Sequence, residues 1–358
     1  MTASTLRFPA EWETQSAVLL TWPHAETDWA PNLVAAEATF ATIARAVLAH
    51  ESLIVGVHHP DLVEAVRAHI APSADQAARL QVTIAPSNDS WVRDHGPLTV
   101  FENGQPVLLD FTFNAWGGKY DSGLDDAIPA VLHRSGVFAD TPLRRVDFVL
   151  EGGALESDGQ GTLLTTTSCL LDPRRNAGIT RATAEARLRA ALGIERVLWL
   201  TQGHLEGDDT DGHIDTLARF ASPETIVYQG CDDPADSHYA SLQAMAEELS
   251  ALRRTDGQPY RLIALPLPRP IRDADGRRLP ATYANFLIIN GAVLLPVYGD
   301  PADRTAQSRL AEAFPDRAIV PIDCSALIRQ FGSLHCVTMQ LPAAVPVRVP
   351  RTGSRCGA

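Results

Sequence analysis

Short apolar and β-branched runs of strand length recur along the whole chain, whereas helical periodicity is confined to a few segments. The clearest helix is expected at 33–48, where apolar residues return at three- and four-residue steps on one face. Strands are expected at 17–21, 53–57, 80–85, 107–111, 145–150, 162–166, 196–200, 225–228, 262–265, 285–289 and 292–297, and further helices at 181–192, 235–252 and 302–314. A doubly wound parallel sheet would need more helices. The pattern therefore predicts an α/β fold in which strands outnumber helices.

The composition is compatible with one well-packed acidic domain. The 358 residues are 45% hydrophobic, which is enough to bury a large core, and no Pro- or Ser-rich linker divides them. We therefore expect one domain over residues 1–350 and a C-terminal tail at 351–358. The formal net charge of −13 argues against nucleic acid or an anionic membrane as a partner and mildly favours a cationic ligand.

The five cysteines are too few and too scattered for a disulfide framework, and the absence of a CxxC pair argues against a structural zinc site. Residues 1–20 show no basic stretch followed by a long apolar one, so no signal peptide is expected. The apolar stretch 286–297 is broken by Asn290, Gly291 and Pro296, which leaves it short of a membrane span. A cytoplasmic protein is the expectation.

Cys336 is the candidate nucleophile. A lone cysteine in an apolar setting is usually inert core filler, and Cys169, Cys231 and Cys324 are interpreted in that way. Cys336 differs because Gly332 and Ser333 open the backbone before it and His335 adjoins it. His335 is not assigned as a base, because neighbouring residues on a strand face opposite ways.

Two further motifs follow strand-like segments, where loops commonly present functional groups. Asp94 lies in the segment Trp91–Pro97 and either serves a functional site or caps a turn in which Arg93 pairs with it. Glu151 precedes Gly152 and Gly153, which permit close backbone approach or positive φ. That glutamate either lines a pocket or caps a turn.

The densest cluster of ionisable residues runs from His204 to Asp215. Carboxylates and imidazoles at such short spacing can bind metal ions, but neither HExxH nor EF-hand spacing is present. In an extended segment, His213 and Asp215 would share one face, as a general acid/base beside a binding carboxylate would require. The strand is expected to continue through 216–220.

The order and spacing of these motifs resemble the agmatine deiminase family, also called the bacterial peptidyl-arginine deiminase type. The resemblance covers essentially the whole chain and is carried by Phe8–Glu13, Thr21–Pro23, Trp91–Asp94, Glu151–Gly153, Thr210–Asp215, Tyr283–Asn285 and His335–Thr338. It implies a single α/β domain built as a five-bladed propeller of ββαβ units around a central active site. The strand pattern by itself does not indicate that symmetry.

The resemblance also implies roles for individual residues. It implies that Cys336 is the nucleophile, His213 the general acid/base, Asp94 and Asp215 the guanidinium-binding carboxylates, and Trp91, Asn285, Asp209 and Glu151 substrate-binding residues. Two positions depart from the family pattern. Asp209 stands where the agmatine enzymes have glutamate, and Gln330-Phe331-Gly332-Ser333-Leu334 stands in place of their Gly-Gly-Gly-Asn-Ile segment before the His-Cys pair. Both departures concern the walls of the pocket more than the reaction.

The activity implied is hydrolysis of agmatine to N-carbamoylputrescine and ammonia through an amidino-cysteine intermediate, in putrescine and polyamine biosynthesis. Free or peptidyl arginine is an alternative substrate, which would need a cation such as Arg93, Arg174 or Arg175 to meet its carboxylate. A metal-dependent hydrolase using the Asp208–Asp215 cluster and a catalytically silent binding protein are further alternatives. The leading interpretation needs no metal or other cofactor. Its only required partner is a small cationic guanidine, and a homodimer is compatible with the sequence.

Overall fold

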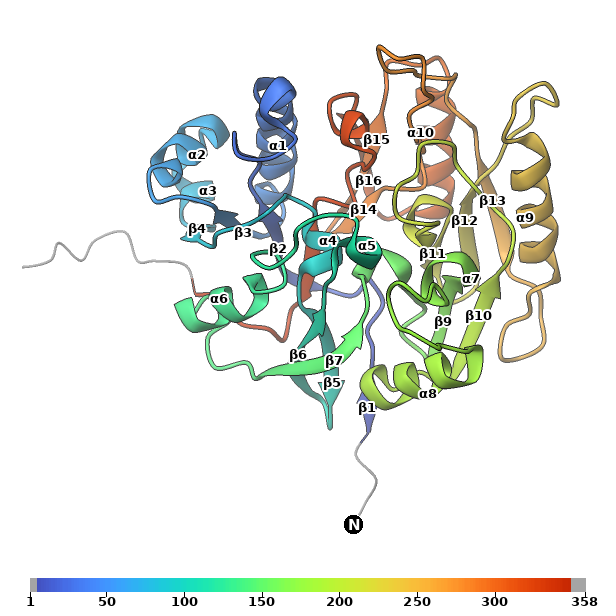
Figure 1. The fold of residues 1–358 in the computed structure, drawn as a ribbon, viewed down its shortest axis with the longest axis horizontal. Coiled ribbons are helices and arrows are strands. Elements are labelled where there is room, and N and C mark those ends of the chain that lie inside the picture. Colours follow the sequence, from blue (N-terminus) through green and yellow to red (C-terminus); the bar gives the residue numbers. More distant parts are fainter. Residues whose placement is uncertain (1–4, 349–358) are drawn as a thin grey trace, which may run out of the picture.

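The strands of this protein form five small sheets, as seen in a computed structural model that describes residues 5–348 (Figure 1). Each sheet contains an antiparallel pair of strands and a further strand that runs parallel to the second member of that pair. At least one helix lies between the two parallel strands in every case. A ββαβ arrangement therefore occurs in each sheet. It is continuous along the chain in four sheets, and in the fifth its first strand is β17, from the C-terminal part of the described chain.

Four of the five sheets have the following strand orders. The first follows β1-β5-β6-β7, with β1 (Leu6–Arg7), β5 (Leu98–Glu102), β6 (Gln105–Thr112) and β7 (Leu143–Val149). The second follows β10-β9-β8, with β8 (Glu156–Ser157), β9 (Thr162–Thr166) and β10 (Arg196–Leu200). The third follows β11-β12-β13, with β11 (Ala218–Ser222), β12 (Thr225–Gln229) and β13 (Arg261–Leu265). The fourth follows β14-β15-β16, with β14 (Leu287–Ile289), β15 (Ala292–Val297) and β16 (Ala318–Asp323).

The fifth sheet joins the two ends of the described chain. Its order is β17-β2-β3-β4, with β2 (Gln15–Thr21), β3 (Ser52–Val57), β4 (Leu80–Ile84) and β17 (Met339–Pro342). Strand β17 pairs antiparallel with β2, and Met339 lies opposite Leu19. Because Cys336 is three residues before β17, this pairing fixes the segment that carries it against the N-terminal part of the chain.

The helices connect the parallel strands and cover the sheets. The longer ones are α1 (Leu33–Leu48), α2 (Leu62–Ile70), α6 (Ile128–Ser135), α8 (Arg181–Leu192), α9 (Tyr239–Ala251) and α10 (Asp303–Ala313). Single turns are α3 (Ala74–Ala77), α4 (Val92–His95), α5 (Ala115–Gly118), α7 (Thr167–Leu170) and the 3-10 turns η1 (Ala30–Asn32), η2 (Gly152–Ala154), η3 (Ile214–Thr216) and η4 (Leu327–Gln330). Figure 1 shows α4 and α5 near the middle of the view, with the longer helices further out.

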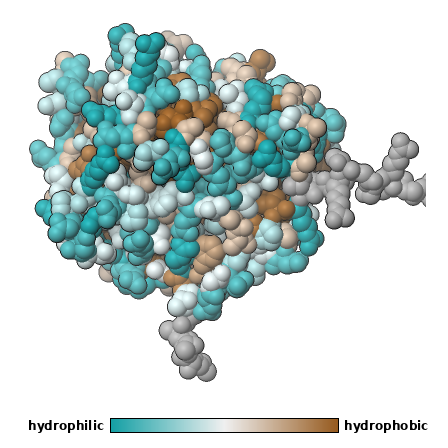
Figure 2. Space-filling view, turned by 180° about the vertical axis from the view of Figure 1, so that it is seen from behind, coloured by the Kyte–Doolittle hydropathy of each residue, from teal (hydrophilic) through white to brown (hydrophobic). Residues whose placement is uncertain are grey.

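Burial follows the sequence pattern. In α1, the face that carries Phe40, Ile43 and Val47 is fully buried and packs toward β3 and β16. Strand β3 is almost entirely buried, as expected for a strand between two parallel neighbours. Hydrophobic residues on the face shown in Figure 2 lie in small separate groups rather than one broad patch. Within residues 5–348, no helix combines the length and apolar character needed to cross a membrane.

The predicted strand-rich, single-domain α/β fold is confirmed. The expected helices at 33–48 and 181–192 and the expected strands at 162–166, 196–200 and 292–297 have the observed bounds. The prediction missed α2, α6 and several short strands, including β5, β8, β16 and β17. The tail at 351–358, which includes Cys356, lies outside the described residues.

Candidate active site

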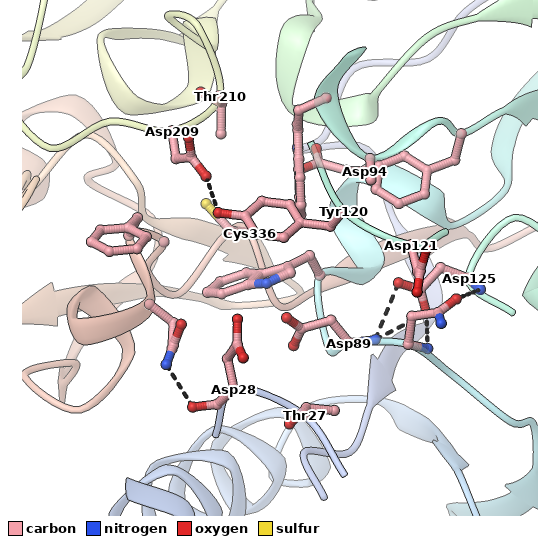
Figure 3. A pocket seen from close by; sticks show the side chains of 18 of the residues that line it. Thr27, Asp28, Asp89, Asp94, Tyr120, Asp121, Asp125, Asp209, Thr210 and Cys336 are labelled. Atoms are coloured by element: carbon pink, nitrogen blue, oxygen red, sulfur yellow. Dashed lines mark hydrogen bonds between the residues drawn. The ribbon is translucent and has the colours of Figure 1, made fainter. Parts of the chain in front are cut away.

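A cavity of about 510 Å³ lies between loops that belong to several sheets (Figure 3). Cys336 and Asp94 lie on its wall, together with Trp91 and Asp209. The lining is strongly acidic and includes Glu26, Asp28, Asp89, Asp94, Asp121, Asp125 and Asp209. Among the residues that form this lining, no arginine or lysine is found. The cavity therefore suits a positively charged ligand.

Asn285 holds the turn that carries Cys336. Its side-chain oxygen accepts hydrogen bonds from the backbone N–H groups of His335 at 2.9 Å and Cys336 at 3.3 Å, and the Cys336 Sγ atom lies 3.3 Å from the same oxygen. Residues 334–337 form a turn rather than a strand, because β17 begins only at Met339. Gly332 is required nearby, since a Cβ there would lie 2.6 Å from the Cη2 atom of the Trp91 ring.

Asp94 is held in place by two donors. Its Oδ1 atom accepts from the Gly153 N–H and its Oδ2 atom from the Trp116 indole N–H, each at 3.0 Å. A Cβ at Gly153 would lie 2.8 Å from Asp94 Oδ1 and 2.5 Å from His213 Nδ1, so glycine is needed for this approach. Burial raises the pKa of Asp94 to about 6, against the opposing effect of His213. The carboxylate is therefore costly to ionise until a cation meets it.

Asp215 is fully buried, and only one of its oxygens is satisfied. Oδ2 lies 2.8 Å from His335 Nδ1, while Oδ1 has no hydrogen-bond partner among the described residues. Burial opposes ionisation of Asp215, but the hydrogen bond from His335 lowers its pKa. An ionised oxygen without a partner is what a bound guanidinium would require.

The segment from His213 to Thr216 is a 3-10 turn, and the expected extended geometry is wrong. The backbone N–H and the hydroxyl of Thr216 both donate to the His213 carbonyl, which closes the turn. His213 and Asp215 therefore do not alternate on a strand face, and β11 begins at Ala218 rather than at residue 216. Their side chains instead contact different partners.

His213 lies between two carboxylates. Its Nδ1 atom is 3.6 Å from Asp94 Oδ1 and its Nε2 atom is 3.4 Å from Glu151 Oε2. Burial opposes the charged form of the imidazole, but Asp94, and then Cys169 and Glu151, raise the pKa of His213 well above its usual range. The ring is therefore a proton donor at neutral pH.

The expected role of Glu151 in substrate binding is not supported by its position. It is buried behind His213, outside the cavity lining, and both of its oxygens accept from Arg175 Nε at 2.9 and 2.8 Å. Its contacts make it an orienting partner of the imidazole. Cys169, interpreted as core filler, also belongs to this group because its Sγ lies 3.7 Å from Glu151 Oε2.

The acidic cluster at 208–215 does not converge on one point. Asp208 accepts from the backbone of Thr210 and Gly212, which caps the loop, and Asp211 pairs with arginines. Asp209 lies on the cavity wall but bonds to Tyr120 Oη at 2.7 Å and lies 3.3 Å from Lys119 Nζ. Of the described groupings with metal-ligand spacing, the one that includes this stretch takes only His213 from it. These contacts do not fit the expected metal alternative.

The sequence pattern missed Trp116 and the pairing partners of His335. Trp116 follows Asn114 and Ala115 and precedes two glycines, a composition that signals unusual backbone angles. The arginines proposed to meet an arginine carboxylate are engaged elsewhere. Arg174 and Arg175 pair with Asp172, Asp211 and Glu151, and Arg93 is buried near Glu11.

Fold and site together define a mixed α/β domain in which a thiol and a carboxylate, Cys336 and Asp94, line an acidic cavity. His213, beside Asp94, and Asp215 are fully buried and lie outside the cavity lining. The chain belongs to the Porphyromonas-type peptidyl-arginine deiminase family, which matches it over residues 7–342. This agrees with the family resemblance of the sequence motifs.

Relatives and solved structures agree with this assignment. An agmatine deiminase of Stutzerimonas stutzeri is 35% identical, with 94% of this chain and 95% of the relative covered. A putative arginine deiminase of Porphyromonas gingivalis has a solved structure that is 50% identical, with a TM-score of 0.90 over 96% of this chain and 100% of that one. A cysteine-to-serine variant of the C. jejuni agmatine deiminase, solved with substrate bound, is 34% identical, with a TM-score of 0.88 over 95% and 97% of the two chains.

The fold extends beyond this family. An amidinotransferase of the saxitoxin pathway from Microseira wollei superposes with a TM-score of 0.51 over 97% of this chain and 98% of its own, at 10% identity. At that identity the likeness concerns the fold alone.

Proposed function

We propose that this protein hydrolyses agmatine to N-carbamoylputrescine and ammonia, with Cys336 as the nucleophile. The observation that carries this proposal is that Cys336 and Asp94 line one acidic cavity and that the charges of Asp94 and Asp215 both act on the Cys336 thiol. Oδ1 of Asp215 has no hydrogen-bond partner among the described residues. Relatives and solved structures bearing the name agmatine deiminase support the choice of substrate. The product would feed putrescine formation.

Asp94 and Asp215 bind the guanidinium in this proposal. A guanidinium is planar and stays charged at physiological pH, and its N–H groups match carboxylate oxygens. Each carboxylate is held by hydrogen bonds. Asp94 accepts from Trp116 and Gly153, and Asp215 accepts from His335. Preorganised carboxylates hold the plane of the cation and leave its carbon accessible to sulfur.

The bound cation also activates the thiol. Burial, followed by the charges of Asp215 and Asp94, raises the pKa of the Cys336 thiol well above its usual range. A guanidinium between the same carboxylates offsets their charge and favours the thiolate, whose proton passes to solvent. The nucleophile therefore forms mainly when substrate is present.

Two half-reactions follow. The Cys336 sulfur bonds to the guanidinium carbon, His213 gives a proton to one terminal nitrogen, and the C–N bond breaks to release ammonia. The neutral His213 then takes a proton from water as the water oxygen bonds to the same carbon. The C–S bond breaks, and the hydroxyl proton of the adduct returns to the thiol as the ureido group forms. Glu151 and Arg175 hold the imidazole in place throughout.

The acidic lining favours agmatine over arginine. A substrate α-carboxylate would enter a cavity lined by seven carboxylic side chains, and its desolvation would be uncompensated. Lys119 lies nearby, but its Nζ atom already contacts Asp209 and Asp211, at 3.3 and 3.1 Å. The ammonium end of agmatine meets no such penalty. Free or peptidyl arginine therefore remains the second candidate.

The five ββαβ sheets are, in this proposal, the blades of a propeller with the active site at its centre. The pairing of β17 with β2 would close the ring. The positions of the site candidates support this arrangement, because each precedes one strand of the antiparallel pair in a different sheet. Asp94 precedes β5, Glu151 β8, His213 β11, Asn285 β14 and Cys336 β17. A ring of blades would bring these five connections to one axis.

Purified enzyme tests the proposal. Incubation with agmatine should release ammonia and N-carbamoylputrescine in equal amounts, and prior treatment with a chelator should leave the rate unchanged. Turnover of arginine or an arginyl peptide in preference to agmatine would move the assignment to the second candidate. A requirement for added divalent metal would overturn the thiol mechanism.

A further inference from the structure

We infer that His335 is a positioning residue that fixes the guanidinium-binding orientation of Asp215 against a buried ion-pair network. This inference rests on the proposed function, because it concerns how one of the two proposed guanidinium carboxylates is held. The sequence pattern gave His335 no role, since it was taken to point away from the site on a strand. In the structure it lies in a turn, and its side chain is 1% exposed.

The imidazole of His335 is held on both sides. Its Nδ1 atom lies 2.8 Å from Asp215 Oδ2, and its Nε2 atom lies 2.7 Å from Glu11 Oε2 and 3.0 Å from Arg219 Nη2. The pKa of Asp215 is lowered, so its carboxylate only accepts, and the Nδ1 atom must carry the proton of that bond. The contacts at Nε2 keep the ring from turning away.

The network behind His335 joins parts of the fold that are distant in sequence. Arg219 Nη2 donates to Glu11 Oε2 at 2.8 Å, Arg219 Nε pairs with Glu156, and Arg219 Nη1 donates to the Phe286 carbonyl at 2.6 Å. These residues belong to β11, β8 and the segments that lead into β2 and β14. The His335 imidazole therefore connects Asp215 to residues that belong to, or lead into, four different sheets.

The hydrogen bond from His335 fixes which oxygen of Asp215 can meet a ligand. With Oδ2 bonded to His335, Oδ1 is the oxygen left for a ligand, and it is buried with no partner among the described residues. Glu11 contacts His335 through Oε2, and its Oε1 atom accepts a hydrogen bond from the Ile288 N–H at 2.8 Å. Glu11, His335 and Oδ2 of Asp215 are thus all held by hydrogen bonds, and Oδ1 of Asp215 is the oxygen that can still accept one.

Two substitutions separate the contacts of the ring. His335→Asn places an amide N–H close to the position of Nδ1 and can still donate to Asp215. His335→Gln reaches toward the position of Nε2 and Glu11 but lacks a donor at the δ position. We expect kcat/KM for agmatine to fall little in His335→Asn and about tenfold to hundredfold in His335→Gln, the range that one charge-assisted hydrogen bond represents.

A pair of alkylating reagents measures, without turnover, how well the two carboxylates bind a cation. 2-Chloroacetamidine is a cation and 2-chloroacetamide its neutral analogue, and with either the Cys336 sulfur displaces chloride to form a C–S bond. The ratio of the two inactivation rates measures how well the carboxylates hold a cation beside the thiol. It is internal to each protein, so a reduced fraction of folded enzyme does not change it. We expect a ratio near that of the wild type in His335→Asn and a clear fall in His335→Gln.

Equal losses in the two variants, or an unchanged ratio in His335→Gln, would overturn the positioning role. Thermal unfolding of both variants identifies a purely structural effect, which would lower both midpoints and leave the ratio alone. The proposed function is judged separately by the wild-type enzyme. If that enzyme releases no ammonia from agmatine, the substrate assignment fails, while the alkylation ratio still tests the link from His335 to Asp215.

Discussion

Trp116 donates its indole N–H to Oδ2 of Asp94 at 3.0 Å, and it does so from a left-handed turn of backbone. The φ angles of Ala115, Trp116, Gly117 and Gly118 are 50°, 56°, 89° and 79°. Residues other than glycine pay about 1–2 kcal/mol for this region. Such strain persists only where the surroundings impose it, and here it places the indole against the carboxylate.

Trp116→Phe should therefore weaken the reaction more than the fold. The substitution keeps most of the ring but removes the donor, which leaves Asp94 Oδ2 without its present partner and raises its pKa further. We expect kcat/KM for agmatine to fall about tenfold or more, as for loss of a hydrogen bond to a charged group. Trp199→Phe is the matched control, because its indole N–H donates to Glu185 outside the cavity. Equal kinetics in the two variants would contradict this role.

Cys336→Ala should abolish turnover while the protein stays folded. The reason is chemical, since the proposed route passes through a bond to this sulfur. Mass spectrometry of wild-type enzyme quenched during turnover should find an amidino group on the peptide that holds Cys336. Cys231→Ala is the control, because that buried thiol lies apart from the cavity. Ammonia release by a folded Cys336→Ala protein would end the thiol mechanism.

Asp94→Asn tests the grip on the cation. Loss of one charge-assisted hydrogen bond is worth about 1.5–3 kcal/mol, or roughly tenfold to 150-fold in kcat/KM, and misplacement of the reacting carbon adds to this. Asp121→Asn should change kcat/KM far less, because that carboxylate lies on the cavity wall but is exposed. Near-normal efficiency of Asp94→Asn would favour the simpler view that Asp94 only caps its turn.

Discrimination between agmatine and arginine follows from the charge of the cavity. The carboxylate of arginine should cost several kcal/mol in this acidic lining, which corresponds to a preference for agmatine of about a hundredfold or more. The measurement is the ratio of the two kcat/KM values in one buffer at fixed ionic strength. Equal values would require a free cation in the cavity.

The mixed α/β class and the presence of Cys336 at the site could be predicted from the sequence, because both depend on local patterns. The helix at 33–48 and the strand at 292–297 are set by apolar periodicity, and Cys336 is marked by the glycine and histidine around it. Short strands such as β8 and β17 were missed, since two to four residues carry little periodicity.

The contacts of the site could not be predicted in the same way. Glu151 was expected at the substrate and instead lies behind His213, because Arg175, 24 residues away in sequence, holds both its oxygens. The pairing of His335 with Asp215 spans 120 residues. Partners at such separations are fixed by how the sheets meet, which local patterns do not contain.

The raised pKa of Asp94 leads to a last prediction, which concerns stability and pH. The pKa rises from an unfolded value near 3.8 to about 6 in the folded protein, so the folded state holds this proton more tightly. The stability it confers is full below pH 3.8 and is lost as pH rises through 6. A difference of about two units corresponds to about 3 kcal/mol. Asp94→Asn cannot ionise, so the free energy of unfolding of the wild type should fall relative to this variant by about that amount between pH 4 and pH 7.

Denaturant unfolding of the two proteins across this range measures the difference directly. Asp89→Asn serves as a comparison, because Asp89 also has a pKa raised to about 6 by burial and lines the same cavity. Added agmatine distinguishes the roles of Asp94 and Asp89, since it should bind beside Asp94 and offset the charge of that carboxylate. In a Cys336→Ala background, which holds substrate without turnover, agmatine should raise the thermal midpoint at pH 7, and adding Asp94→Asn should remove most of that increase. Adding Asp89→Asn instead should leave most of it in place, and the reverse result would assign the cation to Asp89.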